Sequence, residues 1–289
     1  MTHIIYILSG DETNWGSLKK SKKCEKYFED NNWSWDNETD IHLDFFKKYL
    51  EIIINSGFTN IGGWEEVWEF ERTDENGNGI GLYDIFDRSV WDDAVGSDTI
   101  LTGYHWANGW NDYDASSTGY MMANKDYNVI MASATHLYFD HPQEFDPNAR
   151  GLTWATRYSD LWKVFSYRPM SIHSNALYDD WGNKLDYGCI DNQNGKDFKC
   201  AKLEKPENIA GIQGHLWCEE IIKQDFLWTQ MFPRGAALAD RAWRKGRGDD
   251  SSDSWEDINT HSSWSALNTT NFKVSNTVLS IQYPRSYSI

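Results

Sequence analysis

HIIYILSGDE, which spans residues 3–12, passes from an apolar run into a glycine and two carboxylates. The run at residues 3–9 predicts a buried strand, because it is short, β-branched and bounded by Gly10. Neighbouring side chains on a regular strand point to opposite faces, so Asp11 and Glu12 can share one pocket only where the backbone leaves strand geometry. Gly10 permits that departure. Taken alone, the same three residues also fit a helix N-cap, and the pattern leaves both interpretations open.

Four later segments are also short and apolar, and they lie at residues 58–64, 98–106, 127–133 and 209–217. Apolar residues at helical spacing predict helices at 42–57 and, despite Pro233, at 226–245, with a short helix within 87–96. Strands that alternate with helices predict parallel βα units and therefore an α/β fold. In a parallel barrel the carboxyl ends of the strands form the active-site face, so the acidic pair lies where catalytic groups are expected.

The composition restricts the class of protein. The 289 residues are 40% hydrophobic and 25% charged, which is typical of a globular protein. No apolar run reaches the roughly 18 residues that a membrane span needs, and the first residues lack the basic start and small-residue exit of a signal peptide. The formal charge of −17 argues against a nucleic-acid partner, since phosphate binding needs surplus Lys and Arg.

Aromatic residues are unusually numerous, with 16 Trp, 15 Tyr and 13 Phe. Tryptophan suits a carbohydrate site, because its ring face matches the C–H face of a pyranose while its N–H stays available. A large aromatic core explains the same numbers equally well. Composition alone does not choose between a sugar site and a core.

The cysteines and short motifs give weaker indications. Cys189 and Cys200 flank a polar loop that a local disulfide could close, and no cysteine spacing indicates a metal site. The stretch DENGNG at 74–79 resembles the start of a calcium-binding loop, but Ile85 stands where the loop needs Glu, so a turn is favoured. Three glycosylation sequons favour the secretory pathway and begin at Asn32, Asn37 and Asn268.

Longer stretches resemble the catalytic domain of one enzyme family. Residues 6–24, YILSGDETNWGSLKKSKKC, are similar to the strand-4 signature H-x-G-G-D-E…W-x-x-S-x-x-C of family 20 β-N-acetylhexosaminidases, in particular the chitobiase-like members. Further matches follow in the family's order: GGWEEVW (62–68), THLYFDHPQEFDPNARGLTWATRYSDLWKVFSYRP (135–169), GIQGHLWCEEI (211–221) and MFPRGAALADRAW (231–243). The resemblance covers residues 4–245.

This resemblance implies a retaining, substrate-assisted glycoside hydrolase that uses no cofactor or metal and acts on oligosaccharides ending in N-acetylhexosamine. The acetamido oxygen of the sugar attacks C1, and water opens the resulting oxazolinium. Glu12 is implied as general acid and base, Asp11 as acceptor of the acetamido N–H, and Tyr138 as donor to the acetamido oxygen. The other implied substrate contacts are Trp64, Trp106 and Trp217 as pocket walls, Asp140 and Glu219 for ring hydroxyls, and Trp154 for the next sugar. For each tryptophan the alternative is core packing.

Two departures from the family pattern enter the interpretation. Ile7 stands at the family's His and Ser9 at its first Gly, which removes a polar neighbour of the acidic pair. That pair normally follows the fourth barrel strand, so we expect an α/β partial TIM barrel of strands 4–8 with their helices, without the N-terminal strands. Residues 1–245 are expected to form it, and 246–289 a polar linker and tail. We expect the truncation to impair activity, with a non-catalytic glycan-binding remnant as the alternative.

The resemblance also implies secretion or a lysosomal location, although the chain begins without a signal peptide. It leaves open glucosamine or galactosamine units as the substrate, and any oligomeric state. His136 and His141 are interpreted as ordinary loop residues, and no role is implied for His215.

Overall fold

The computed structural model describes residues 6–11, 18, 20–33, 38–69, 72–73, 79–80, 86–107, 118–175 and 202–243. Several features predicted above lie outside these ranges: Glu12, Asn37, Ile85, Cys189, Cys200, Asn268 and the tail 246–289. Within the described part, no helix combines the length and apolar character needed to cross a membrane.

The main sheet contains five strands: β1 (Tyr6–Ile7), β2 (Asn60–Trp64), β5 (Ile100–His105), β6 (Asn128–Met131) and β7 (Ile209–Ile212). They lie in the order β1-β2-β5-β6-β7, and β2 pairs in parallel with both β1 and β5. Each strand falls within a segment predicted from its apolar character, and the α/β class with a parallel sheet is confirmed. A second, antiparallel pair joins β3 (Arg72–Thr73) to β4 (Gly79–Ile80), and residues 74–78 of the turn predicted between them lie outside the described residues.

The remaining elements are helical, and those with the 3-10 geometry are labelled η. They are α1 (Lys22–Asn31), α2 (Glu38–Asn55), α3 (Glu65–Trp68), η3 (Arg88–Trp91), α4 (Asp92–Val95), α5 (Thr118–Asn124), α6 (Ala134–Leu137), α7 (Leu161–Phe165), η5 (Pro169–Ser174), η6 (Pro206–Asn208), α8 (Gln224–Met231) and α9 (Arg234–Trp243).

The chain divides into two compact units. Unit 1 comprises residues 1–105, 118–130 and 201–210, and unit 2 comprises 106–117, 131–200 and 211–289. β6 and β7 begin in unit 1, and each ends in unit 2.

In unit 1, β5 and α5 pack together through glycines that face larger side chains. A Cβ on Gly103 of β5 would lie 2.4 Å from Met122 Sδ of α5, and one on Gly119 of α5 would lie 2.8 Å from His105 Cγ of β5. Such distances are well inside van der Waals contact, so a larger residue at either position would force the facing side chain to move.

A buried polar link joins the carboxyl ends of β2 and β5. Glu65 follows β2 directly, and His105 ends β5; their exposed fractions are 3% and 0%. His105 Nδ1–H donates to Glu65 Oε2 at 2.8 Å, and the hydroxyl of Thr118 donates to the same oxygen. Because a buried carboxylate needs such donors, this arrangement fixes the two strand ends relative to the start of α5.

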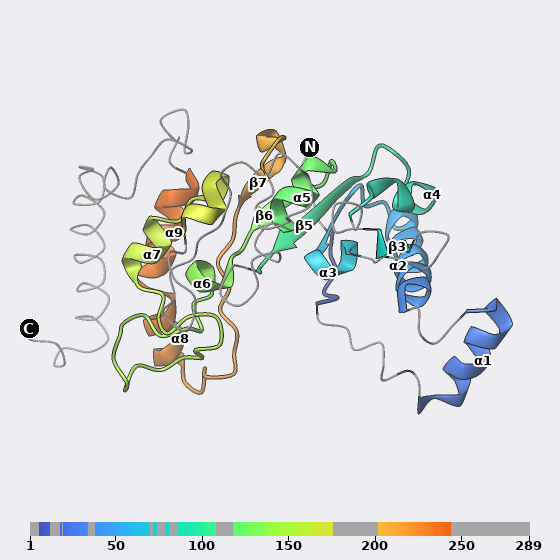
Figure 1. Ribbon diagram of the computed structural model, residues 1–289. Coiled ribbons are helices and arrows are strands. Elements are labelled where there is room, and N and C mark those ends of the chain that lie inside the picture. Colours follow the sequence, from blue (N-terminus) through green and yellow to red (C-terminus); the bar gives the residue numbers. More distant parts are fainter. Residues whose placement is uncertain are drawn as a thin grey trace, which may run out of the picture. The chain divides into compact units, whose positions relative to one another are not determined.

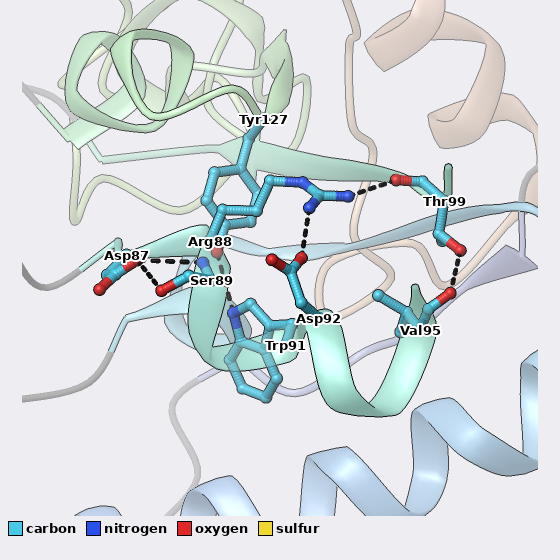
Figure 2. Close-up of polar contacts among 8 residues, drawn as sticks. All are labelled: Asp87, Arg88, Ser89, Trp91, Asp92, Val95, Thr99 and Tyr127. Atoms are coloured by element: carbon cyan, nitrogen blue, oxygen red, sulfur yellow. Dashed lines mark hydrogen bonds and ion pairs between the residues drawn. The ribbon is translucent and has the colours of Figure 1, made fainter. Parts of the chain in front are cut away.

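The connection before β5 is also held by polar contacts (Figure 2). Arg88 donates to the Asp92 carboxylate at 2.7 Å and to the Thr99 carbonyl at 2.6 Å. Trp91 Nε1–H donates to Tyr127 Oη at 2.9 Å, and both rings are fully buried. Burial raises the pKa of Tyr127, so its hydroxyl stays protonated.

In unit 2, α7 and α9 lie side by side (Figure 1). The prediction of one helix over 226–245 is wrong, because α8 ends at Met231 and α9 begins at Arg234. Phe232 between them is extended, with φ −112° and ψ 141°. The physical reason is Pro233, which cannot donate the helical hydrogen bond and disfavours a helical residue before it.

Candidate functional site

The first strand ends with the backbone departure that the sequence predicts. Gly10 has φ +93°, in the region that favours glycine, and a Cβ there would lie 2.6 Å from Val67 Cγ2. Asp11 follows it and is exposed, and it accepts a hydrogen bond from Ser9 Oγ at 3.0 Å. Trp64, at the end of β2 in the same unit, is buried and packs edge-on against Tyr104 at 5.8 Å.

Backbone pairing in unit 2 brings the segments after β6 and β7 together. Tyr138 and His215 form an isolated parallel bridge. His215 N–H donates to the Leu137 carbonyl at 2.9 Å, and Phe139 N–H donates to the His215 carbonyl at 2.6 Å. Residues 215 and 217 point to the same side of an extended chain, so the Trp217 side chain lies on the same side as that of His215.

Three aromatic side chains surround Tyr138. Its ring centroid lies 5.8 Å from Trp217, 5.8 Å from Trp154 and 5.3 Å from His215. Trp106 continues the cluster, with its ring 5.8 Å from Trp154 at 71°. Tyr138 is 4% exposed, whereas Trp154 and Trp217 are 37% and 36% exposed, so the two indoles offer ring surface to a ligand while the tyrosine is held between them.

His215 supports one side of this aromatic cluster. Its ring stacks on Trp217 with a centroid distance of 5.5 Å and an angle of 9°. Burial lowers the pKa of His215 to about 4, so the imidazole stays neutral at neutral pH.

Asp140 is the buried carboxylate of this site. It is 1% exposed, and no side chain among the described residues donates a hydrogen bond to either carboxylate oxygen. Burial raises its pKa to about 6, and the nearby charge of Glu219 adds to the rise. The backbone N–H groups of Asp140 and Trp217, together with the cation of Arg234, oppose it. A buried carboxylate with no side-chain donor keeps acceptor capacity for a hydroxyl that a ligand supplies.

Two histidines near Asp140 in the sequence are buried. His136 and His141 are 1% and 0% exposed. His141 lies in a loop as predicted, whereas His136 lies in α6. His141 Nδ1–H donates to the Leu152 carbonyl, and its ring lies 5.2 Å from that of Trp154. Desolvation lowers the pKa of both, to about 4 for His141, so both are neutral and act in packing.

The structure thus gathers six of the nine predicted site residues in unit 2: Trp106, Tyr138, Asp140, Trp154, Trp217 and Glu219. Asp11 and Trp64 belong to unit 1, and Glu12 lies outside the described residues. The sequence reasoning missed the contributions of His215 and Arg234, although both stand inside the segments that carry the resemblance. Within the described part of the chain, no three His, Cys, Asp or Glu side chains gather as a metal site requires.

Comparison with known proteins identifies one family. The family described as "Glycosyl hydrolase family 20, catalytic domain" matches residues 3–246. A β-hexosaminidase of Vibrio vulnificus is 29% identical over 255 residues, which are 87% of this chain and 25% of that protein. The N,N'-diacetylchitobiase of Vibrio harveyi is 29% identical over 133 residues, which are 46% of this chain and 14% of that protein.

Among solved structures, the chain is similar to a GH20 exo-β-N-acetylglucosaminidase from Vibrio harveyi, solved in complex with N-acetylglucosamine. The TM-score is 0.54 with 20% identity, and the match covers 92% of this chain and 32% of that one. This likeness shows the fold. The chain spans a quarter of the Vibrio vulnificus relative's length and a third or less of the other two.

Proposed function

Because the chain belongs to glycosyl hydrolase family 20, we propose that it is a β-N-acetylhexosaminidase that removes terminal N-acetylhexosamine units from oligosaccharides. The names of the Vibrio relatives, a hexosaminidase and a chitobiase, support this activity. Under this proposal the five strands of the sheet correspond to strands 4–8 of the TIM barrel that family catalytic domains adopt. Residues 1–245 form that domain, and secretion or a lysosomal location follows from the family.

The mechanism that we propose uses the substrate's own amide as the nucleophile. The Tyr138 hydroxyl donates to the acetamido oxygen and aligns it with C1, while Asp11 accepts from the acetamido N–H. Glu12 protonates the leaving oxygen as the C1–O bond breaks. The oxazolinium that forms is opened at C1 by water, whose proton returns to Glu12, so the configuration is retained.

One observation of the structure carries this proposal. Tyr138 lies between two partly exposed indoles, those of Trp154 and Trp217, and two residues before the buried carboxylate of Asp140, which receives no hydrogen bond from a described side chain. Indole faces bind the C–H face of a pyranose, and a buried carboxylate accepts from its hydroxyls. A pyranose that carries an amide satisfies all three kinds of group at once.

The proposal is tested by release of 4-nitrophenol from its N-acetyl-β-glucosaminide. We expect release by the whole chain, a loss of kcat of about 10²-fold or more in Glu12→Gln, and a loss of about tenfold in Tyr138→Phe. Tyr158→Phe is the matched control, because Tyr158 packs on Phe145 outside the aromatic cluster. Release by the unchanged chain that does not exceed release by Glu12→Gln would contradict the proposal.

A glycan-binding protein without turnover is the second candidate. It is favoured by Ile7 and Ser9, which stand at the family's His and first Gly beside the acidic pair. It is also favoured by the Ser9 hydroxyl, which donates a hydrogen bond to one carboxylate oxygen of Asp11. This candidate predicts that a thiazoline mimic of the oxazolinium binds equally well to the unchanged chain and to Asp11→Asn, with no 4-nitrophenol released. Loss of thiazoline binding in Asp11→Asn would favour the hydrolase.

A further inference from the structure

Arg234 is a charged side chain at the start of α9 with no exposed surface. Burial lowers its pKa to about 9, and the charges of Asp140 and Asp160 oppose that change. The guanidinium therefore remains a cation at neutral pH. A buried cation is retained in a fold only when acceptors surround it, so its partners show what it holds in place.

The acceptors of Arg234 include the main chain on both sides of Asp140. Nη2–H donates to the Phe139 carbonyl at 2.6 Å, and Nη1–H donates to the His141 carbonyl at 2.9 Å. A third carbonyl, that of Ser159, accepts from Nη1 at 2.9 Å. Because the guanidinium is planar and rigid, it fixes the separation of the two carbonyls that flank the carboxylate residue.

The remaining N–H groups of Arg234 tie the same segment to α8. They donate to the Gln230 main-chain carbonyl at 2.7 and 3.1 Å and to its side-chain carbonyl at 2.9 Å. The Gln230 amide in turn donates to the Arg150 carbonyl at 2.8 Å. All five guanidinium N–H groups are thereby used, and helix residues hold both ends of the segment 139–152.

Within that segment the chain closes on itself behind Asp140. Leu152 N–H donates to the Asp140 carbonyl at 2.9 Å. Gly151 passes so close that a Cβ on it would lie 2.5 Å from the same carbonyl oxygen. The main chain of Asp140 therefore has little freedom while Arg234 and Gln230 hold the two ends.

We propose that Arg234 is a positioning residue. Its hydrogen bonds to the main-chain carbonyls on either side of Asp140 hold the Asp140 carboxylate where it can accept from a sugar hydroxyl. The part played by the sugar rests on the proposed function. The hydrogen bonds from Arg234 to the main chain do not rest on the proposed function, because they are present in the unliganded protein. No side chain among the described residues donates to the Asp140 carboxylate, while the Asp140 carbonyl accepts from Leu152 N–H and the carbonyls on both sides of it accept from Arg234. This is the arrangement expected of a carboxylate that is positioned for a ligand.

Amide hydrogen exchange of the unliganded chain, measured by mass spectrometry, tests whether Arg234 holds the main chain of residues 139–152. In Arg234→Lys, which keeps the charge but offers three donors in place of five, we expect amides in 139–152 to exchange about tenfold faster, as loss of one charge-assisted bond predicts. The matched control is Arg241→Lys on the same helix, since Arg241 donates to the Tyr167 carbonyl at 2.6 Å, away from this segment. Unchanged exchange in 139–152, or equal acceleration across unit 2, would overturn the proposal.

A double-mutant cycle with the thiazoline as probe tests the link to Asp140. Arg234→Lys is expected to weaken thiazoline binding about tenfold in the unchanged chain and less than about twofold in an Asp140→Asn background, because its effect passes through that carboxylate. Additive losses would overturn the positioning role. If the unchanged chain does not bind thiazoline at all, the proposed function fails, and the exchange experiment alone decides whether Arg234 holds the segment.

Discussion

Burial of the ionised Asp140 carboxylate lowers the stability of the folded protein, and the size of this loss depends on pH. Its pKa is raised to about 6 in the folded chain, above the ordinary value of 3.8. Between these two values the folded state binds the proton more tightly than the unfolded state, so stability falls as pH rises from about 4 to about 6. Above pH 6 the penalty is fully present.

We therefore expect Asp140→Asn to stabilise the protein at pH 7.5, by about 1 kcal/mol, while it weakens sugar binding. The gain should shrink as pH falls toward 4.5, where the carboxyl of the unchanged chain is protonated in the folded state. Urea denaturation at the two pH values measures it. Glu144→Gln, at an exposed position of the same segment, is the control and should show no such trend. A stabilisation that is equal at both pH values would contradict the assignment.

Gly10 and Gly57 provide a matched pair at the residue scale. Both have positive φ, +93° and +90°, but a Cβ on Gly10 would meet Val67 at 2.6 Å, whereas a Cβ on Gly57 would meet nothing within 4 Å. We expect Gly57→Ala to cost about 1 kcal/mol of unfolding free energy through backbone strain alone. Gly10→Ala should cost about 3 kcal/mol, because a clash adds to the strain.

Chemical denaturation of both variants measures this difference. Equal costs would show that Val67 moves aside freely and that glycine is needed at position 10 only for its φ.

At the scale of elements, two glycines stand at the second position of a helix and should respond in opposite directions to alanine. Gly119 of α5 faces His105 at 2.8 Å, whereas the nearest atom to a Cβ on Gly235 of α9 is Met231 Cγ at 3.5 Å, an ordinary contact. Gly119→Ala must displace the imidazole that donates to Glu65, so we expect a loss of about 2 kcal/mol.

Gly235→Ala adds a Cβ that makes an ordinary contact in a helix, and it should raise stability by about 0.5 kcal/mol. Thermal midpoints of the two variants, compared with that of the unchanged chain, give the signs. A stabilising Gly119→Ala would mean that the contact of β5 with α5 is not close-packed.

The elements that could be predicted are those whose signal lies in a single segment. The strands at 60–64 and 100–105 and the helix at 38–55 follow from local apolar patterns. The break between α8 and α9 was also readable at Pro233, but the helical spacing on both sides of it outweighed the missing donor in the prediction.

The site was less predictable, because its parts come from distant segments. The family resemblance supplied Tyr138 and Trp217, but nothing local to either shows that a bridge between residues 138 and 215 brings them together. Arg234 gave no signal, because its three acceptors around Asp140 and in Ser159 are main-chain carbonyls more than seventy residues away, and carbonyls are present at every position of any sequence.

At the scale of the whole molecule, the formal charge of −17 should influence the choice of glycan. A field of this sign repels anionic substrates, and salt screens it. We expect the neutral 4-nitrophenyl N-acetyl-β-glucosaminide to be preferred over its 6-sulfate by about tenfold in kcat/KM at low salt, with the preference narrowing as salt is added. Kinetics at two ionic strengths measure the ratio. A ratio that does not respond to salt would assign the preference to local contacts.

The bridge between Tyr138 and His215 has a consequence for how this site can change over time. It uses only the amide and carbonyl of residue 215 and the main chain of residues 137 and 139, so any residue but proline can keep it. Substitution at 215 can therefore alter the surface behind the Trp217 indole while the separation of tyrosine and tryptophan is preserved. Natural variation or laboratory selection could adjust the fit to a glycan by substitution at position 215 alone, without moving Tyr138 or Trp217.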